Sequence, residues 1–351
     1  MHQGSQQRGR VVLQRGGPRV IARVHNKVVC APVMLRKSFG LLGGAALAGG
    51  AMCGRFRRDD AVKSNCGAKV TAGFVEALEA RLAKLEAQQM SKGPLDGKVA
   101  LVTGGSRGLG LGMALGMAEA GAHVVLNGRG EEALVAARER IEGHGGSASI
   151  AVFDVTDEAA MIAGVAAVLA EQGRIDILMN NAGINLRSKF VESTAEQLRR
   201  VLDVNLVGPY LLAREVAKHM IARGGGGRII NIGSVQSVVG RATIQPYACS
   251  KHAIHGMTKG LATELGPHGI TVNAIGPGYF ITEMTKSLLD NENFNKMVTG
   301  RTPLGRWGYP ADLAGPAVFL ASDGAGFVNG HLLMVDGGMT ISLCDSLLPP
   351  S

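Results

Sequence analysis

Three side chains suited to acid–base chemistry occur at a spacing that can bring them together. Ser234 follows a short apolar run, Tyr247 comes thirteen residues later, and Lys251 lies four residues beyond Tyr247. On a helix, residues i and i+4 share one face, so we expect the Lys251 ammonium to stabilise a Tyr247 phenolate. Such help matters because an unperturbed tyrosine, with a pKa of about 10, is a poor base near neutral pH.

A glycine-rich loop, Thr103-Gly104-Gly105-Ser106-Arg107-Gly108-Leu109-Gly110, joins a buried-type apolar run to an alanine- and leucine-rich helical stretch. Glycines let a backbone approach a pyrophosphate closely, and a helix N-terminus supplies oriented N–H groups. The loop therefore predicts a dinucleotide site whose contacts include Gly104, Ser106, Arg107, Gly108, Leu109 and Gly110.

The second apolar run ends without the carboxylate that would receive the ribose hydroxyls of NAD. It ends instead at Arg129, which together with Arg107 offers guanidinium groups to a 2′-phosphate. This pattern favours NADP over NAD. The alternative is that Arg129 is a solvated loop residue, which is common for arginine.

Polar and small residues follow the third and fourth apolar runs. Asp154 and Val155 come after the third run, and Asn181, Ala182 and Gly183 come after the fourth. Open α/β sheets bind ligands at the carboxyl ends of their strands, so we expect these residues to line an adenosine pocket. Taken alone, each would more often be a turn or a helix cap.

Short apolar runs alternate with helical stretches from Lys98 onward. The runs are Val99 to Thr103, His123 to Leu126, Ser149 to Phe153, Ile175 to Met179, Arg228 to Gly233, Thr271 to Ile275 and Leu332 to Asp336. The helical stretches include 110–120, 131–142, 158–172 and 247–265. This alternation predicts an α/β fold, a doubly wound sheet of seven parallel strands in a single domain.

Charge is unevenly distributed along the 351 residues. Residues 1–90 contain 15 Lys and Arg against 5 Asp and Glu, whereas the rest contains 22 against 23. Because the predicted domain is not basic, nucleic-acid binding is not expected. Five scattered cysteines without a C-x-x-C pair argue against a disulfide framework, and His252 and His255 lack a third ligand, so no metal is expected.

Residues 1–90 form a basic N-terminal extension. Its first 58 residues hold no acidic residue, as in organellar presequences, while the stretch from Met34 has the layout of an export signal. The third interpretation is upstream sequence outside the functional protein. We expect a cytoplasmic enzyme that is complete from Met90, with an organellar or exported location as the alternatives.

No stretch of the sequence predicts a membrane span. The uncharged stretch 38–54, the longest within the N-terminal extension, is too short and too rich in glycine for one. The apolar spacing over 71–89 predicts an amphipathic helix, and residues 343–351 form a C-terminal tail.

Taken in order, these motifs resemble the short-chain dehydrogenase/reductase family over about residues 91–342. The matching residues are Thr103-Gly104-x-x-x-Gly108-x-Gly110, Asn181-Ala182-Gly183, Asn205, Ser234, Tyr247-x-x-x-Lys251 and Pro277-Gly278. The resemblance implies a Rossmann-type sheet and a homo-oligomer, either a tetramer or a dimer.

The same resemblance implies roles for individual residues. Tyr247 would be the general acid and base, and Ser234 would hydrogen-bond the reacting carbonyl. Lys251 would hold the nicotinamide ribose and lower the tyrosine pKa, and Asn205 would anchor a proton-relay water. The nicotinamide end of the cofactor would also contact Pro277, Gly278 and Thr282.

Within the family, four segments resemble the gluconate 5-dehydrogenases. They are 185–187, 234–237, 276–280 and 301–308. The resemblance implies a small sugar-acid substrate, and we expect it to contact Arg187, Ser234, Gln236 and Tyr247. The segment 279–306 has few apolar anchors, so we expect it to form a lid. The 3-oxoacyl-[acyl carrier protein] reductases share most of this scaffold and remain the alternative. A nucleotide-binding protein without turnover and a membrane-tethered assembly protein are rival classes.

Overall fold

The computed structural model describes residues 93–343 continuously, and before them residues 14–15, 19–24, 27–32, Ala77 and Ala80. The chain divides into two units, Met1–Asn65 and Cys66–Ser351. In the first unit, β1 (Gln14–Arg15), β2 (Arg19–Val24) and β3 (Lys27–Pro32) form a three-stranded antiparallel sheet. Apart from the helical Ala77 and Ala80, the helix predicted over 71–89 lies outside the described residues, as does the tail beyond residue 343.

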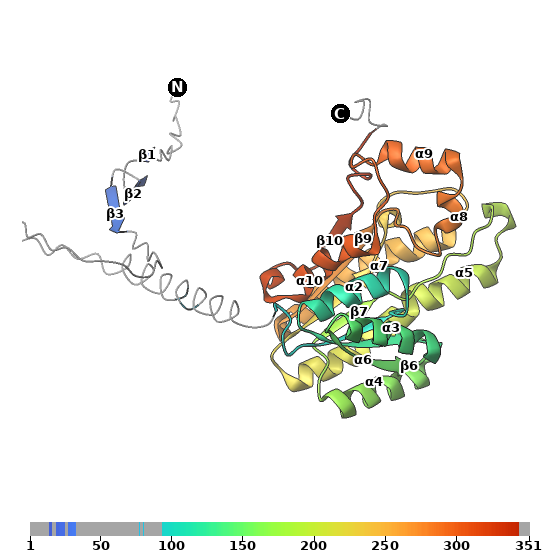
Figure 1. The fold of residues 1–351 in the computed structure, drawn as a ribbon, viewed down its shortest axis with the longest axis horizontal. Helices are drawn as coiled ribbons and strands as arrows, with labels where there is room; N and C mark the ends of the chain where they lie inside the picture. Colours follow the sequence, from blue (N-terminus) through green and yellow to red (C-terminus); the bar gives the residue numbers. More distant parts are fainter. Residues whose placement is uncertain are drawn as a thin grey trace, which may run out of the picture. The chain divides into compact units, whose positions relative to one another are not determined.

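The second unit is built on a sheet of seven strands (Figure 1). They are β4 (Val99–Thr103), β5 (His123–Gly128), β6 (Ser147–Val152), β7 (Ile177–Asn180), β8 (Gly227–Ile232), β9 (Ile270–Pro277) and β10 (Leu332–Val335). Their order is β10-β9-β8-β7-β4-β5-β6, and every neighbouring pair is parallel. The predicted doubly wound sheet is confirmed.

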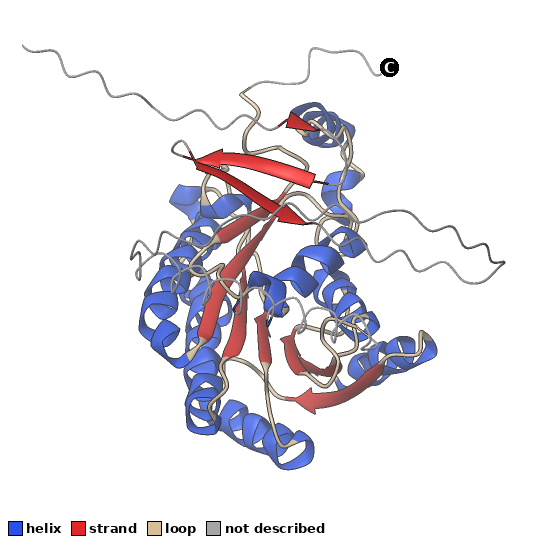
Figure 2. Cartoon of the chain, turned by 90° about the vertical axis from the view of Figure 1, so that its left-hand side faces the viewer, coloured by secondary structure: helices blue, strands red, loops and turns tan. Residues whose placement is uncertain are grey.

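Helices cover both faces of this sheet (Figure 2). They are α2 (Gly108–Glu119), α3 (Glu131–Gly143), α4 (Glu158–Gln172), α5 (Ala195–Leu202), α6 (Gly208–Arg223), α7 (Gln245–Leu265), α8 (Lys286–Leu289), α9 (Glu292–Arg301) and α10 (Ala314–Ala321). Among the described residues, no helix has the length and apolar character needed to cross a membrane.

The central strand β4 shows why the strands of this sheet have nearly continuous apolar sequences. Its side chains alternate between two cores: Ala100 and Val102 pack on the side of α2, α3 and α10, whereas Val99 and Leu101 pack on the side of α4 and α6. All are buried. Because successive strand residues point to opposite faces and helices cover both, the strand is apolar from Val99 to Val102 and turns polar only at Thr103, its carboxyl end.

The strand order also locates the functional edge. β4 lies between β5, which follows it in the chain, and β7, which starts the other half of the sheet. At such a reversal the connecting segments diverge to opposite faces and leave a crevice beyond the carboxyl ends of the strands. Here those ends are Thr103 and Asn180.

Candidate active site

The glycine loop leads from β4 into α2 through a backbone that needs glycine. Gly104 and Gly108 have φ angles of +61° and +56°, and a Cβ at Gly110 would lie 2.2 Å from the Gly104 carbonyl oxygen. Helix α2 begins at Gly108 with no side-chain cap and no acidic residue in its first turn. Its N–H groups are therefore available to a bound anion, so the loop fits a dinucleotide pyrophosphate.

Asn181 holds this loop against the neighbouring strand end. Its Nδ2 donates to the Thr103 carbonyl (2.8 Å) and to the Gly104 carbonyl (3.1 Å). The Thr103 hydroxyl accepts from the backbone N–H groups of Asn181 (2.9 Å) and Ala182 (3.0 Å). The amide that was expected to line an adenosine pocket therefore fixes the loop. Gly183 follows beside Asn205, whose Oδ1 would lie 3.3 Å from a Cβ at Gly183.

The two arginines expected at the 2′-phosphate both lie exposed beside carboxylates. Arg107 Nη1 is 3.0 Å from Glu283 Oε2, and Arg129 Nη1 is 3.7 Å from Asp154 Oδ2. Burial disfavours ionisation of Asp154, but hydrogen bonds from Thr156 and the charge of Arg129 outweigh it and lower the Asp154 pKa. Such exposed ion pairs are weak, so both guanidinium groups can exchange partners for a phosphate.

The remaining cofactor candidates lie around this loop. Thr282 packs beside Gly108, where a Cβ would be 3.7 Å from the threonine methyl group. Pro277 ends β9, and Gly278 passes so close to Asp336 that a Cβ would lie 2.8 Å from its Cα. Ser106 and Leu109 are partly buried and Val155 is buried.

The predicted catalytic group converges at the start of α7. Tyr247 and Lys251 share one face of this helix, with the Lys251 Nζ 5.5 Å from the Tyr247 ring centroid. Ser234 follows β8, and its hydroxyl lies close enough to Tyr247 to lower the pKa of that phenol. Lys251 is only 4% exposed and donates from Nζ to the Ile232 carbonyl (2.7 Å). The structure thus brings together all three residues whose spacing suggested chemistry.

Burial shifts the ionisation of this group. Burial raises the pKa of Tyr247, and the Ser234 hydrogen bond offsets this only in part. Burial also lowers the pKa of Lys251 to about 8. In the protein alone, desolvation of the partly buried phenol is the largest influence on its pKa, and the predicted lowering of that pKa by Lys251 stays a prediction. Tyr247 therefore carries its proton at neutral pH and is ready to donate it.

Asn205 lies in a π-helical turn, η2 (Asp203–Val207), between α5 and α6. Its Oδ1 accepts from the Ile184 N–H (2.8 Å), and its Nδ2 donates to the Ile184 carbonyl (2.9 Å) and to the Ser250 hydroxyl (3.1 Å). Ser250 in turn donates to the Tyr247 carbonyl (2.7 Å). Asn205 therefore links the loop after β7 to the catalytic helix. A π-bulge at this point is typical of functional sites.

The expected substrate side contains unpartnered polar groups. Gln236 is 5% exposed, and its Oε1 is buried without a hydrogen-bond partner. The amide oxygens of Asn185 and Gln245 are in the same state. Gln236 was predicted to contact the substrate, whereas Gln245 was not. The position of Gln245, two residues before Tyr247, was the available signal. Buried polar atoms without partners are rare, and substrate contact is one explanation for them.

Arg187 is exposed, and a second arginine lies near it. Desolvation and the charge of Arg241 both lower the pKa of Arg187. Arg241 Nη1 donates to the Tyr279 hydroxyl (3.5 Å), and the Arg241 guanidinium carbon lies 4.5 Å from the Phe294 ring centroid. Sequence reasoning missed Arg241. Only folding brings it to the residues of the 279–306 segment.

The predicted lid contains α8 and α9 and is anchored by an aromatic cluster of Tyr279, Phe294 and Trp307. The Tyr279 ring centroid lies 5.4 Å from that of Phe294 and 5.5 Å from that of Trp307, both edge to face. The Trp307 indole also donates to Asn295 Oδ1 (2.8 Å). Such contacts hold α9 in place over its neighbours.

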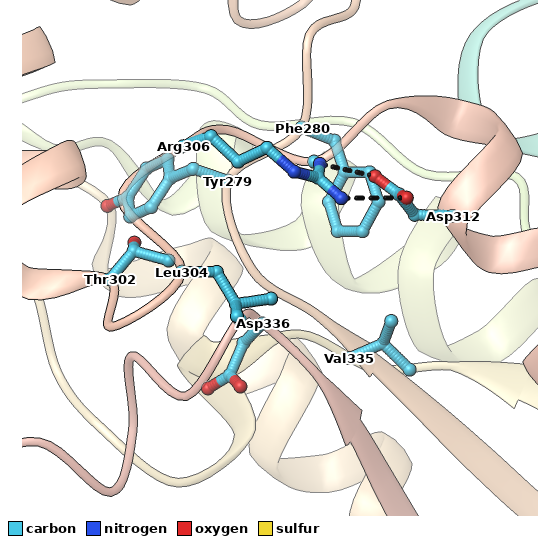
Figure 3. A pocket seen from close by; sticks show the side chains of 10 residues that line it. Tyr279, Phe280, Thr302, Leu304, Arg306, Asp312, Val335 and Asp336 are labelled. Atoms are coloured by element: carbon cyan, nitrogen blue, oxygen red, sulfur yellow. Dashed lines mark hydrogen bonds and ion pairs between the residues drawn. The ribbon is translucent and has the colours of Figure 1, made fainter. Parts of the chain in front are cut away.

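A small hollow lies between residues of this segment and the chain around Asp312 and Asp336, and it is a poor candidate for chemistry (Figure 3). Arg306 on its wall faces Asp312 and donates to both carboxylate oxygens (2.7 and 3.0 Å). Asp336 accepts from Gly338 and Thr340. The charged groups are thus already paired. No group of His, Cys, Asp and Glu able to hold a metal occurs among the described residues.

Comparisons with known proteins agree with this geometry. The family model described as "Enoyl-(Acyl carrier protein) reductase" matches residues 104–340. Gluconate 5-dehydrogenase of Gluconobacter oxydans is 50% identical over 249 residues, covering 71% of this chain and 97% of that protein. The chain belongs to the short-chain dehydrogenase/reductase family. It is accordingly an oxidoreductase acting on CH–OH groups.

Two further family members bear on the substrate and the cofactor. A 2-dehydro-3-deoxy-D-gluconate 5-dehydrogenase of Formosa agariphila is 41% identical, covering 70% of this chain and 94% of that protein. The crystal structure of a gluconate 5-dehydrogenase from Burkholderia cenocepacia, in complex with NADP and tartrate, superposes with a TM-score of 0.69. It is 46% identical and covers 71% of this chain and 97% of that one. This short-chain dehydrogenase/reductase therefore has sugar-acid enzymes among its relatives.

Proposed function

We propose that this enzyme interconverts D-gluconate and 5-keto-D-gluconate with NADP. One observation carries the proposal: Ser234, Tyr247 and the buried Lys251 lie together at the carboxyl edge of the sheet that also presents the open N-terminus of α2. The names of the relatives from Gluconobacter oxydans and Burkholderia cenocepacia support the substrate, and the NADP in the latter structure supports the cofactor.

The protein would hold NADP along the edge described above. The N-terminus of α2 would bind the pyrophosphate, and Arg107 and Arg129 would bind the 2′-phosphate. The adenosine end would lie against Asp154, Val155 and Ala182, and the nicotinamide end against Lys251, Gly278 and Thr282. When bound, the reduced cofactor supplies the hydride, and the side chains around the carbonyl handle the proton.

In the reduction direction, the carbonyl oxygen of the keto acid accepts hydrogen bonds from Ser234 and Tyr247. As negative charge develops on that oxygen, Tyr247 transfers its proton and Ser234 stabilises the same oxygen. The raised pKa of Tyr247 suits this step because it keeps the donor protonated. The Lys251 ammonium then stabilises the phenolate that remains, and the Asn205 linkage keeps the catalytic helix in register.

The polar groups beside the catalytic tyrosine suit a polyhydroxylated acid. Unpartnered amide oxygens at Asn185, Gln236 and Gln245 can accept hydrogen bonds from sugar hydroxyls. Arg187 is the candidate to bind the carboxylate. An acyl thioester, by contrast, would present an apolar chain to these oxygens and leave them unsatisfied.

A second candidate substrate is 2-dehydro-3-deoxy-D-gluconate, named for the relative from Formosa agariphila. The test measures NADPH oxidation with 5-keto-D-gluconate and NADP reduction with 2-dehydro-3-deoxy-D-gluconate. NADPH oxidation with an acetoacetyl thioester is the comparison. We expect the highest specificity constant for 5-keto-D-gluconate. Faster turnover of the deoxy acid would transfer the assignment to it, and faster turnover of the thioester would reject both sugar acids.

A further inference from the structure

Two arginines close to the substrate side have no carboxylate partner. Within residues 93–343, neither Arg187 nor Arg241 forms an ion pair, although the charge of Arg241 acts on Arg187. Their loops are joined by a hydrogen bond from the Ser188 N–H to the Thr243 carbonyl (3.1 Å). Two neighbouring guanidinium groups repel each other, so a pair with no protein carboxylate beside it favours an anionic ligand.

Arg241 is held in place by groups that do not neutralise it. Its guanidinium lies over the face of Phe294, and Nη1 donates to the Tyr279 hydroxyl. A guanidinium carries five N–H donors, so this single hydrogen bond leaves four for a ligand. Because the aromatic cluster fixes the ring of Tyr279, the arginine is preorganised.

The backbone next to Arg241 is strained. Thr243 has a φ of +69°, and among the described residues it is the one non-glycine residue with a positive φ. A β-branched residue in that region is unfavourable and persists only where the surroundings impose it. Here the Thr243 carbonyl accepts a hydrogen bond from the Ser188 N–H in the Arg187 loop, and the residues after Thr243 begin the helix that carries Tyr247. The strain therefore serves the junction that joins the arginines to the catalytic helix.

The substrate carries its carboxylate away from the reacting carbonyl. In 5-keto-D-gluconate the carboxylate and the reacting carbonyl lie at opposite ends of a short carbon chain, so the anion must bind away from Tyr247 yet near it. Tyr279 connects Arg241 with the catalytic tyrosine, because its hydroxyl accepts a hydrogen bond from Arg241 Nη1 and its phenol acts electrostatically on Tyr247.

We propose that Arg241 and Arg187 form a two-arginine clamp for the substrate carboxylate, in which Arg241 determines specificity for acids. The clamp rests on the proposed function, because it assigns the carboxylate of that sugar-acid substrate. Tyr279 is a positioning residue in this arrangement and acts through Arg241.

The test compares Arg241→Met and Arg241→Lys with the control Lys189→Met, which removes an exposed cation paired with Glu192 in the same loop region. We expect Arg241→Met to raise the KM for 5-keto-D-gluconate at least tenfold, the scale of a lost charge-assisted hydrogen bond, with kcat changed less than threefold. For an uncharged ketohexose such as D-fructose, kcat/KM should change less than threefold. Arg241→Lys should restore part of the affinity, and Lys189→Met should match the wild type.

A binding measurement separates this proposal from the proposed function. Titration of D-gluconate into the enzyme saturated with NADPH needs no turnover, and Arg241→Met should weaken the Kd at least tenfold. Tyr279→Phe, which keeps the ring but removes the hydroxyl, should weaken it less. An unchanged gluconate Kd, or equal losses for charged and uncharged substrates, would overturn the clamp. Wild-type enzyme that binds gluconate but does not reduce 5-keto-D-gluconate would reject the proposed function and leave the clamp supported.

Discussion

Two buried charged sites at opposite edges of the same sheet are built in contrasting ways. At the amino edge, the Asp176 cluster contains a carboxylate that accepts from the Val99 N–H (3.0 Å), Arg174 (2.5 and 2.8 Å) and Arg223 (2.6 Å). At the carboxyl edge, the buried Lys251 ammonium has one hydrogen-bond acceptor, the Ile232 carbonyl. The Asp176 carboxylate therefore has a full set of hydrogen-bond donors, whereas the Lys251 ammonium retains N–H donors for a ligand.

The pKa directions reflect this difference. Burial opposes ionisation of Asp176, yet its hydrogen bonds from Arg174, Arg223 and Val99 outweigh that cost and lower its pKa, so the charged form is favoured. At Lys251 burial is unopposed and disfavours the charge. A fully paired buried charge supports the fold, whereas an incompletely paired one costs stability and is retained where chemistry needs it.

The largest effect should come from Tyr247→Phe, which tests the functional half of the comparison. The change removes one hydroxyl and little volume, so kcat should fall by about 10²- to 10⁴-fold while NADPH affinity and the melting temperature stay close to wild type. Steady-state kinetics, cofactor titration and thermal unfolding check this. Turnover like that of the wild type would rule out Tyr247 as the proton donor.

The second largest effect should come from Asp176→Asn, which tests whether the Asp176 cluster stabilises the fold. Removing the charge leaves Arg223 without its carboxylate, and we expect a loss of about 2 to 4 kcal/mol in the free energy of unfolding, reduced by the partial exposure of Arg174. Urea denaturation measures it. The kcat of the folded variant should be unchanged, and a loss of kcat without a loss of stability would contradict the division of roles.

The two sites should also differ in the pH dependence of stability. Asp176 has a lowered pKa in the folded state, so its stabilising contribution is present above the unfolded pKa of about 4 and is lost as the pH falls through the folded value. Lys251 behaves oppositely. Its folded pKa of about 8 lies below the unfolded value of 10.5, so the cost of burying its charge is full below pH 8 and is relieved as the pH rises to 10.5.

Lys251→Met should therefore flatten the rise in stability between about pH 8 and 10.5, by at most about 3 kcal/mol. Denaturation curves across that range compare the variant with wild type. Lys259→Met, which removes a lysine with an exposed side chain on the same helix, is the matched control and should leave the slope unchanged. The same slope in all three proteins would show that Lys251 is not desolvated as described.

The smallest expected effect concerns the cofactor. Arg129→Asp places a second carboxylate beside Asp154 and replaces attraction for the 2′-phosphate with repulsion, so kcat/KM for NADPH should fall about tenfold or more while that for NADH changes little. Arg138→Met, on the adjoining helix α3, is the control. An unchanged ratio of the two specificity constants would remove Arg129 from the cofactor site.

Much of the scaffold could be predicted because its determinants are local. Val99–Thr103 and Glu158–Gln172 have the predicted bounds, since a buried strand and a helix each leave a period in the sequence. The spacing of Tyr247 and Lys251 likewise determines that they share a helical face. The glycines of the loop after β4 were recognisable because the pyrophosphate-binding turn needs backbone freedom.

Other features were decided by tertiary structure alone. Arg241 meets Tyr279 across 38 residues of sequence, and the Asn181 amide turns to the glycine loop, because the strand order places distant segments side by side. The raised pKa of Tyr247 was likewise invisible in the sequence. Spacing along the chain determines which groups share a face, but desolvation and through-space partners depend on what packs against that face, and only the folded chain supplies it.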